Sequence, residues 1–418
     1  MPRLRLSGLL VDGAPLRRDP GFRALWVSQS ASAVARESIR LALPLHAYLL
    51  TGSAAAAGIL SLVQLIPGLI APLAGGALAD AVDRRLLLGL SQAGLGAVAV
   101  LLLLAALLPE PPVVLLFVAG ALMSVLFGIE HPARIASVPR LTPPERLRAA
   151  LALSALAFQV TAIVGPAVAG ILVGASGFPA AYAFAVLAYL LATAGSLRLP
   201  ALPPSGDRRP GIGMIREGFA YVRSRRIILG TFAIDIDAVV FGLPVAVLPV
   251  LAIEAFGIGP AAVGLLAAAR GAGALGAALF SGWVPGVVRV GRAVLVVVLV
   301  YALATCVVGL STGHLWLAVA AVVVAGAVDV LSAVLRAAII QHVTPDELRG
   351  RVTAIHVLLV TSAPRIGDIR ATFMAEAFGA TTSLLAGGLL AIAGVAVVDR
   401  LWPELRRYRE RDLPAGGG

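Results

Sequence analysis

Charged side chains interrupt several of the longest apolar stretches of this sequence. Arg36, Glu37 and Arg40 lie well inside the first of these stretches, and spacing puts Arg36 and Arg40 on one helical face. An ionisable group within a membrane is costly and is therefore a functional candidate by default. Two arginines on one face of an aqueous cavity would suit an anionic substrate, and the adjacent acid could exchange a proton.

Further charges recur in later apolar stretches and form two groups. The candidates for substrate or proton binding are Arg36, Glu37, Arg40, Asp235, Asp237, Arg270 and Asp368. Of these, the four acids Glu37, Asp235, Asp237 and Asp368 could carry a proton. The candidates for structural ion pairs are Glu130, Arg134, Asp329 and Arg336; Glu130 and Arg134 are spaced i,i+4. For every one of these residues, a structural ion pair or a side chain reaching to the interface is the alternative.

The elements that carry these charges are long enough to cross a bilayer. The chain of 418 residues is 59% hydrophobic and 13% charged, whereas soluble proteins contain about 25% charged residues. Apolar stretches of membrane-spanning length lie near 24–50, 54–79, 86–108, 112–135, 149–174, 179–199, 227–253, 260–285, 292–311, 314–340, 352–377 and 382–401. The composition predicts an all-α membrane protein with twelve transmembrane helices.

The arginines predict the orientation of the helices. Connections after even-numbered spans contain arginines, including Arg84, Arg85 and Arg289, and both termini are also Arg-rich. Connections after odd-numbered spans contain none. Because positive charge collects in cytoplasmic loops, we expect both termini in the cytoplasm and a multi-pass protein of the cell membrane.

The chain divides into two repeats on either side of a Pro-rich connection. Arg134 and the following Thr142-Pro143 recur 202 residues later as Arg336 and Thr344-Pro345, and Gly165 falls on Gly367 at the same offset. Such a parallel repeat predicts two pseudo-symmetric six-helix bundles. We expect a cytoplasmic segment 1–23, a bundle 24–199, a linker 200–226 with a short amphipathic helix on the membrane surface at 214–222, a bundle 227–401 and a cytoplasmic tail 402–418.

Several classes of chemistry are excluded or unsupported by the residue types. All 33 basic residues are Arg, so a P-loop or a Lys Schiff base is impossible; a high-GC bacterial genome would explain this bias. Cys306 is the only cysteine, and the five histidines show no metal-ligand spacing. We therefore predict no enzyme activity, no cofactor and no metal. The net charge of +11 is attributed to loops facing anionic lipid rather than to nucleic-acid binding.

A short polar interruption between the second and third spans resembles a known family motif. Gly76, Asp80, Arg84 and Arg85 match the loop between the second and third helices of major facilitator superfamily transporters, although Asp83 replaces the usual Gly. The resemblance implies that Asp80 is a latch contacting the facing half when the cytoplasmic side is closed, with Arg84 bracing the loop. The alternative is a charged helix end that only fixes topology. The second half has no acid aligned with Asp80.

The fifth span carries a second resemblance. Gly165, Pro166 and Gly170 match the core of the antiporter motif of drug:proton exporters. This chain has Ala169 where the motif has the first of two glycines. A Gly-Pro pair within a span frees a backbone carbonyl and allows bending. The alternative is an ordinary proline kink.

Resemblances elsewhere cover almost the whole chain. They include Leu43-Pro44, Val263-Gly264-Leu265-Leu266, Gln341-His342-Val343-Thr344-Pro345-Asp346 and Gly367-Asp368. Together they resemble the enterobactin exporter branch of the superfamily, which also contains macrolide-efflux-type proteins. The resemblance implies a monomeric secondary transporter that exports a hydrophobic or amphipathic small molecule, driven by the proton gradient. Uptake of an anionic metabolite and a non-transporting membrane scaffold remain the alternatives.

Overall fold

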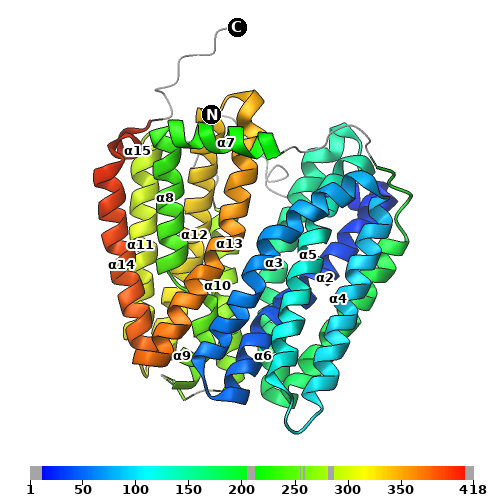
Figure 1. Cartoon of the computed structure of the whole chain (residues 1–418), viewed down its shortest axis with the longest axis horizontal. Coiled ribbons are helices and arrows are strands. Elements are labelled where there is room, and N and C mark those ends of the chain that lie inside the picture. Colours follow the sequence, from blue (N-terminus) through cyan, green and yellow to red (C-terminus); the bar gives the residue numbers. More distant parts are fainter. Residues whose placement is uncertain (1–11, 205–211, 255, 258, 281–286, 410–418) are drawn as a thin grey trace, which may run out of the picture. The chain divides into compact units, whose positions relative to one another are not determined.

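The computed structural model describes residues 12–204, 212–254, 256–257, 259–280 and 287–409. Within these ranges all regular structure is helical. Contacts divide the chain into two compact units: unit 1 contains residues 1–43 and 66–209, and unit 2 contains residues 44–65 and 210–418. Figure 1 shows that the long helices of each unit run side by side.

Unit 1 is built from the first helices of the chain. They are α1 (Ala14–Arg18), α2 (Pro20–Thr51), α3 (Ala54–Ala81), α4 (Arg84–Ala106), α5 (Val113–Leu141) and α6 (Pro144–Leu197), of which α2 and α3 continue into unit 2. Helix α6 covers two of the predicted spans and turns sharply at Gly177, whose φ is 79°. Glycine adopts this left-handed conformation without the clash that a Cβ causes.

Unit 2 contains the remaining helices. They are α7 (Ile212–Ser224), α8 (Arg226–Phe241), η2 (Val245–Val247), α9 (Leu248–Glu254), α10 (Pro260–Leu279), α11 (Val290–Leu310), α12 (Leu315–Val343), α13 (Asp346–Phe378), α14 (Ala380–Leu401) and α15 (Pro403–Arg407). The span predicted at 227–253 is interrupted between α8 and α9. At the break, Gly242 lies against the ring of Tyr301, where a Cβ would have no room, and Pro244 has no N–H for a helical hydrogen bond.

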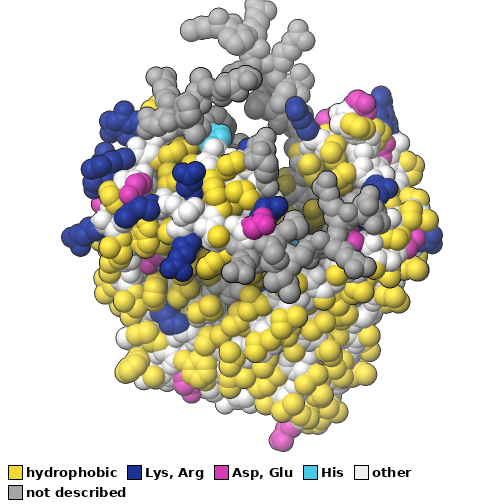
Figure 2. All heavy atoms as spheres, turned by 45° about the horizontal axis from the view of Figure 1, so that its top comes forward, with side chains coloured by type: hydrophobic (Ala, Val, Ile, Leu, Met, Phe, Trp, Pro, Cys, Tyr) yellow, Lys and Arg dark blue, Asp and Glu magenta, His cyan; other side chains and the backbone are white. Residues whose placement is uncertain are grey.

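Ten helical stretches of the described residues are long and apolar enough to cross a membrane. The long helix α6 counts once among them but contains the fifth and sixth predicted spans. Helix α2 is not among the ten, because charged and polar side chains interrupt its apolar sequence. Large exposed apolar residues such as Leu90, Leu279 and Trp316 cover the flanks, and Figure 2 shows this hydrophobic surface with the arginines gathered toward the end that faces forward. Such a surface suits contact with lipid.

Small residues allow several close helix crossings. A Cβ on Gly75 of α3 would lie 2.6 Å from Cα of Ile129 on α5. In unit 2, a Cβ on Gly326 of α12 would collide with the carbonyl oxygen of Arg270 on α10. Glycine at these positions lets backbones approach closely, as is common in membrane helix pairs.

The amphipathic segment of the linker forms α7, a helix of 13 residues. Figure 1 shows α7 lying across the ends of the long helices of unit 2. The hydroxyl of Tyr221 donates to the carbonyl of Val343 at 3.0 Å, and Arg351 of α13 forms an ion pair with Glu217. Phe219 is exposed, which leaves an apolar ring free for lipid. Positions 205–211 of the predicted linker lie outside the described residues.

Candidate functional site in the two helical units

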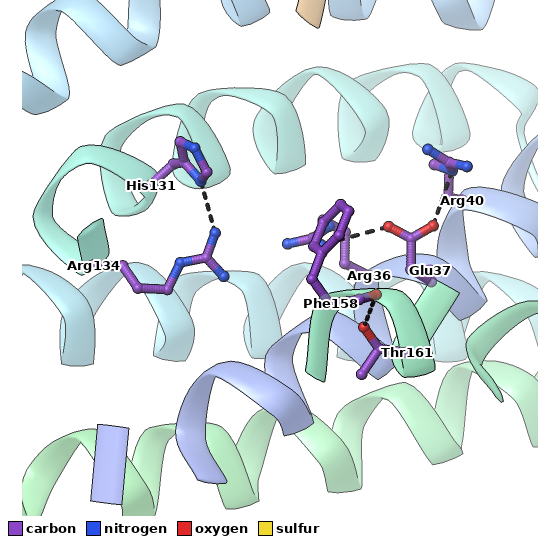
Figure 3. Close-up of polar contacts among 7 residues, drawn as sticks. All are labelled: Arg36, Glu37, Arg40, His131, Arg134, Phe158 and Thr161. Carbon is purple, nitrogen blue, oxygen red and sulfur yellow. Dashed lines mark hydrogen bonds and ion pairs between the residues drawn. The ribbon is translucent and has the colours of Figure 1, made fainter. Parts of the chain in front are cut away.

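Three charged residues of α2 form one connected group. The carboxylate of Glu37 contacts Arg36 at 3.5 Å and Arg40 at 3.1 Å. Glu37 is 4% exposed, whereas the side chain of Arg40 is 59% exposed. One carboxylate contacts two arginines, so the group has more positive than negative charge. Figure 3 shows the carboxylate of Glu37 between the two guanidinium groups.

Aromatic rings surround the inner arginine of this group. The guanidinium of Arg36 lies 4.4 Å from the ring centroid of Phe127 on α5 and 6.0 Å from that of Phe158 on α6. Both distances allow cation–π attraction. One nitrogen of Arg36, Nη1, is buried without a hydrogen-bond partner among the described residues. This arginine therefore retains an unsatisfied donor in an aromatic environment.

The Gly-Pro motif of α6 packs directly against Glu37. A Cβ on Gly165 would lie 2.6 Å from Cβ of Glu37 and 3.0 Å from the carbonyl oxygen of Val34. The hydroxyl of Ser38 donates to the carbonyl of Gly165 at 2.9 Å. Pro166 and Gly170 are buried on the same helix. The structure therefore joins two features that are far apart in the sequence, the acid of α2 and the motif of α6.

Glu130 and Arg134 of α5 are spaced i,i+4, but their side chains have different surroundings. Arg134 hydrogen-bonds Nδ1 of His131 at 2.7 Å, and both residues are shown in Figure 3. Glu130 is fully buried, and neither carboxylate oxygen has a hydrogen-bond partner among the described residues. Glu130 and Arg134 interact electrostatically, but no direct ion pair between them is present in the described part of the chain. The interior of unit 1 thus contains charges that are not closely paired.

A cavity of about 140 Å³ lies between α2, α5 and α6. Its lining residues are Gln29, Ser30, Ala33, Arg134, Ile135, Val138, Leu151, Ser154, Ala157 and Phe158. The side-chain amide of Gln29 donates to the hydroxyl of Ser154 at 3.1 Å. Six of the ten lining residues are apolar; the others are one arginine, the hydrogen-bonded pair Gln29 and Ser154, and Ser30.

The loop between α3 and α4 is held within unit 1. Arg84 is buried and contacts Asp80 at 3.6 Å; its Nε donates to the carbonyl of Ala79 and its Nη1 to that of Ala136. Arg85 donates to the carbonyl of Leu197 at 2.7 Å. The Asp80 side chain is 43% exposed. Arg84 therefore connects the end of α3 to α5, while Asp80 retains an accessible carboxylate.

Two further residues of the motif region are Asp83, at the start of α4, and Gly76, within α3. Asp83 caps α4, accepting from the backbone N–H of Arg85 at 2.8 Å and from that of Leu202 at 3.0 Å. The backbone N–H of Arg84 in turn donates to the carbonyl of Leu202 at 3.0 Å. Gly76 has open space where a Cβ would be. The acidic residue at position 83 thus ties the loop to the chain that follows α6.

In unit 2, two of the charged candidates and a histidine converge in a largely buried network. Asp235 of α8 forms an ion pair with Arg336 of α12 at 2.7 Å, and Nε2 of His356 on α13 lies 3.3 Å from the other oxygen of Asp235. Asp235 is 0% exposed and Arg336 is 3% exposed. Arg336 also donates to Ser332 at 2.6 Å, and the His356 ring stacks on Phe232. The network therefore joins three helices.

The two other candidate proton carriers of unit 2, Asp237 and Asp368, lie in different surroundings. Asp237 is 6% exposed, and a Cβ on Gly394 of α14 would collide with its carboxylate. Its Oδ2 has no partner among the described residues. Asp368 of α13 accepts from the backbone N–H of Ala246 at 3.1 Å, which satisfies a donor at the break between α8 and α9.

Arg270 pairs with Asp329 across two helices. Its guanidinium on α10 lies 3.1 Å from the carboxylate of Asp329 on α12, and both side chains are partly exposed. Asp368 and Tyr301 also interact electrostatically with Arg270. The two predicted structural residues Asp329 and Arg336 therefore have different partners, Arg270 and Asp235, rather than each other.

Sequence reasoning missed the aromatic and polar residues around the unit 1 charges. Phe127, Phe158, Gln29 and Ser154 belong to no sequence motif, and only their contacts in the folded unit identify them. Spacing along one helix carries a signal for charged neighbours but not for partners on other helices. Among the described residues, no group of three or more His, Cys, Asp and Glu side chains could hold a metal ion.

Sequence comparison finds relatives that are named exporters. This chain is 28% identical over 407 residues to the enterobactin exporter EntS of Citrobacter koseri, covering 96% of both chains. It has the same identity and coverage with the enterobactin exporter EntS of Escherichia coli O1:K1. The similarity thus extends over nearly the full length of both proteins.

Solved transporter structures share the fold at low sequence identity. A POT family transporter crystallised with 5-aminolevulinic acid gives a TM-score of 0.75 at 13% identity, covering 92% of this chain and 96% of that one. A mutant of the nucleoside transporter NupG gives 0.73 at 13% identity, covering 91% and 99%. The transmembrane secretion effector family matches residues 12–415. The chain therefore belongs to this family of the major facilitator superfamily and is a multi-pass membrane transporter rather than an enzyme.

Proposed function

We propose that this protein is a proton-coupled exporter of a hydrophobic or amphipathic small molecule and works by alternating access. We infer export because the relatives are named enterobactin exporters. The arrangement of the arginines supports both termini in the cytoplasm of a bacterial cell, so that the substrate leaves the cytoplasm. The transporter acts as a monomer.

The main observation behind the proposal is the packing of Gly165 against Glu37. A close approach between α2 and α6 at Gly165 brings the Gly-Pro motif beside an acid that contacts two arginines. Pro166 cannot donate to the preceding turn, so α6 can bend at this contact. A bend there would change the environment of Glu37. The charge state of Glu37 can be coupled to a conformational change only if its environment differs between the two conformations.

Different charged residues have different roles in the proposal. Arg36, Arg40 and Arg270 contact the substrate. The proton is carried by one of the four acids in the spans, and Glu37 is the first to test because it is buried and contacts a substrate-binding arginine. Asp235 is the least suited of them, because losing its charge would leave Arg336 buried and unpaired.

Accumulation of a compound panel in expressing cells tests the proposal. Dyes, macrolides and siderophores are measured in cells with the full chain and with empty vector, with and without a protonophore. We expect lower accumulation of at least one compound with the chain, and the protonophore should abolish the difference. The variant Glu37→Gln should behave as empty vector, and Glu110→Gln, in an exposed loop position, should behave as the parent chain.

Each other outcome contradicts part of the proposal. Higher accumulation with the chain would indicate uptake. Export that is insensitive to the protonophore would rule out coupling to protons, and export retained with unchanged pH dependence in Glu37→Gln would move the proton to another acid. No difference for any compound, with the protein present in the membrane, would favour a non-transporting scaffold.

A further inference from the structure

We propose that α11 and α14 of unit 2 form a binding site for one anionic phospholipid of the surrounding membrane, with its phosphate between Arg292 and Arg400. Both helices are long and apolar enough to cross a membrane, and they pack side by side in this unit (Figure 1). The site goes beyond the proposed export, because it takes a membrane lipid rather than the transported molecule. It shares no residue with the candidates for substrate or proton binding.

Contacts made by glycines show how α11 and α14 are aligned. A Cβ on Gly309 of α11 would lie 3.2 Å from Cβ of Leu384 on α14, and a Cβ on Gly388 of α14 would collide with Sγ of Cys306 on α11. The helices are therefore antiparallel, with residue 309 level with 384 and residue 306 level with 388. Continued at 1.5 Å per residue, this alignment places the two arginines of the site within about 3 Å of the same level.

Each arginine lies at the end of an exposed apolar stripe. Leu389 and Val397 of α14 are 62% and 48% exposed. Rotation of about 100° per residue puts the stripe of each helix about a quarter to a half turn from the surface where the helices meet, in the same sense on both. On antiparallel helices the two stripes therefore share one side of the pair. Their apolar members include Val296, Leu303 and Leu310 on α11 and Leu389 and Val397 on α14.

The acids of α14 and α15 do not neutralise the two arginines. Arg292 and Arg400 are exposed, and neither has an ion pair or a side-chain hydrogen bond in the part of the chain that the structure describes. Asp399, beside Arg400, contacts Arg406 at 2.9 Å. The acid of α15 forms an ion pair with α8 at 2.8 Å. Both guanidinium groups therefore retain donors for the oxygens of a phosphate.

The short helix α15 joins the ends of the neighbouring helices. The backbone N–H of Gly291 donates to the carbonyl of Tyr408 at 3.4 Å, and a Cβ on Gly291 would collide with the carbonyl oxygen of Leu405. Trp402, just before α15, packs against Gly230 of α8. These contacts hold the backbone next to both arginines, so the site does not need to be assembled by the lipid.

An anionic phospholipid matches both parts of this surface. Its phosphate can accept from two guanidinium groups, and its acyl chains would cover the apolar stripes. The site lies at the end predicted to face the cytoplasm, where anionic lipid attracts basic residues. A soluble phosphate would use only the arginines. A second copy of the chain in the same membrane would bring like charges to the same level.

Native mass spectrometry of the purified full chain in detergent tests the site. Phosphatidylglycerol and phosphatidylcholine with the same acyl chains are added in separate titrations. Each arginine near an anionic lipid contributes about fivefold in affinity, so the first phosphatidylglycerol should bind roughly twentyfold more tightly. Arg292→Gln with Arg400→Gln should abolish this preference. Arg23→Gln with Arg148→Gln removes two exposed arginines of unit 1 and should leave it unchanged.

Cross-linking locates the bound lipid. A phosphatidylglycerol with a diazirine on one acyl chain should label peptides that contain Val296, Leu303 or Val397. The double variant of the site should lose this labelling. If that variant does not unfold at the parent temperature, the single variant Arg292→Gln decides, with an expected loss of about fivefold in the preference.

Several results would overturn the assignment. These are equal affinity for the two lipids, a preference that survives the loss of both arginines, and an equal loss in the unit 1 control. Displacement of the lipid by excess inorganic phosphate would indicate an ordinary phosphate site. Dimers in place of lipid-bound monomers would show that a second copy covers the stripes, and cross-links confined to other helices would place the lipid elsewhere.

Discussion

Burial distinguishes the ion pairs of this protein. The pair of Asp235 and Arg336 is almost completely buried, whereas the side chains of Arg226 and Glu404 are 63% and 44% exposed. Removing one partner of a buried pair leaves a charge without compensation, but an exposed charge returns to water. Loss of one partner should therefore destabilise the protein much more at the buried pair than at the exposed pair.

Replacement of Asp235 tests this difference. We expect Asp235→Ala to lower the free energy of unfolding by about 3–5 kcal/mol, because Arg336 would remain buried and unpaired. Glu404→Ala should cost at most about 1 kcal/mol. Thermal unfolding of the purified protein in detergent measures both. A double variant, Asp235→Ala with Arg336→Ala, should be less destabilised than the sum of the single variants; strict additivity would argue against the buried pair.

Replacement of Gly165 tests the contact between α2 and α6. A Cβ would lie 2.6 Å from Cβ of Glu37, so Gly165→Ala should separate the helices and cost about 1–3 kcal/mol of stability. Gly276→Ala is the control, since nothing lies within 4 Å of its Cβ position and alanine favours a helix more than glycine does. Unfolding temperatures compare the two. A Gly165→Ala protein as stable as the Gly276→Ala protein would contradict this packing.

At the scale of elements, the junctions between helices determine how the chain is held. Asp83 both caps α4 and binds the backbone of Leu202 beyond α6. Gly242 and Pro244 interrupt the span after α8, and Asp368 satisfies a donor at that break. Both junctions use a carboxylate to accept backbone N–H groups that a continuous helix would have paired internally.

Removing the Asp83 carboxylate should release the start of α4 and the segment that follows α6 at the same time. In Asp83→Ala, loss of the cap costs about 0.5–2 kcal/mol. The amides of Arg85 and Leu202 lose their acceptor, so they should exchange hydrogen faster in mass spectrometry of peptides that cover 82–88 and 199–204. Asp83→Asn retains an acceptor oxygen and should stay close to the parent rates. Asp80→Ala leaves both bonds to Leu202 in place and should not accelerate exchange at Leu202. Equal exchange rates in Asp83→Ala and the parent would disprove the anchoring role.

At the scale of the whole molecule, one segment of α2 and α3 does not group with the rest of those helices. Residues 44–65, from α2 and α3, group with unit 2. Within that unit, Tyr48 donates to Glu254 at 3.1 Å, Ser53 donates to Glu376 at 3.0 Å, and Gln64 contacts Arg365. A polar network therefore holds this segment of the first repeat against the helices of the second repeat.

The orientation in the membrane can be tested with single cysteines. In a Cys306→Ser background, Glu110→Cys should react with a membrane-impermeant maleimide in intact cells, because arginines are absent from its connection. Arg148→Cys should react only after the membrane is opened. Both positions are exposed, so access to the reagent depends on the side of the membrane. Labelling in the opposite pattern would reverse the proposed topology.

The sequence by itself determined the membrane class, the positions of the helices and the family. Length and hydropathy are local properties, so apolar stretches identified the spans, and the loop of Asp80 and Arg84 was recognised from consecutive residues. The structure has a helix, α7 (Ile212–Ser224), over the stretch 214–222 where an amphipathic helix is predicted. The interruption at Gly242 was not predicted, because the sequence on both sides of it is equally apolar.

Only the tertiary structure decided which charged residues meet. Asp329 and Arg336 are two turns apart on one helix, yet they contact Arg270 and Asp235 on other helices. Glu130 and Arg134 have the spacing of a pair, yet Arg134 bonds His131. Partner choice depends on the rotation and crossing of packed helices, which close approaches such as Gly165 to Glu37 set. Spacing along the sequence carries no information about either.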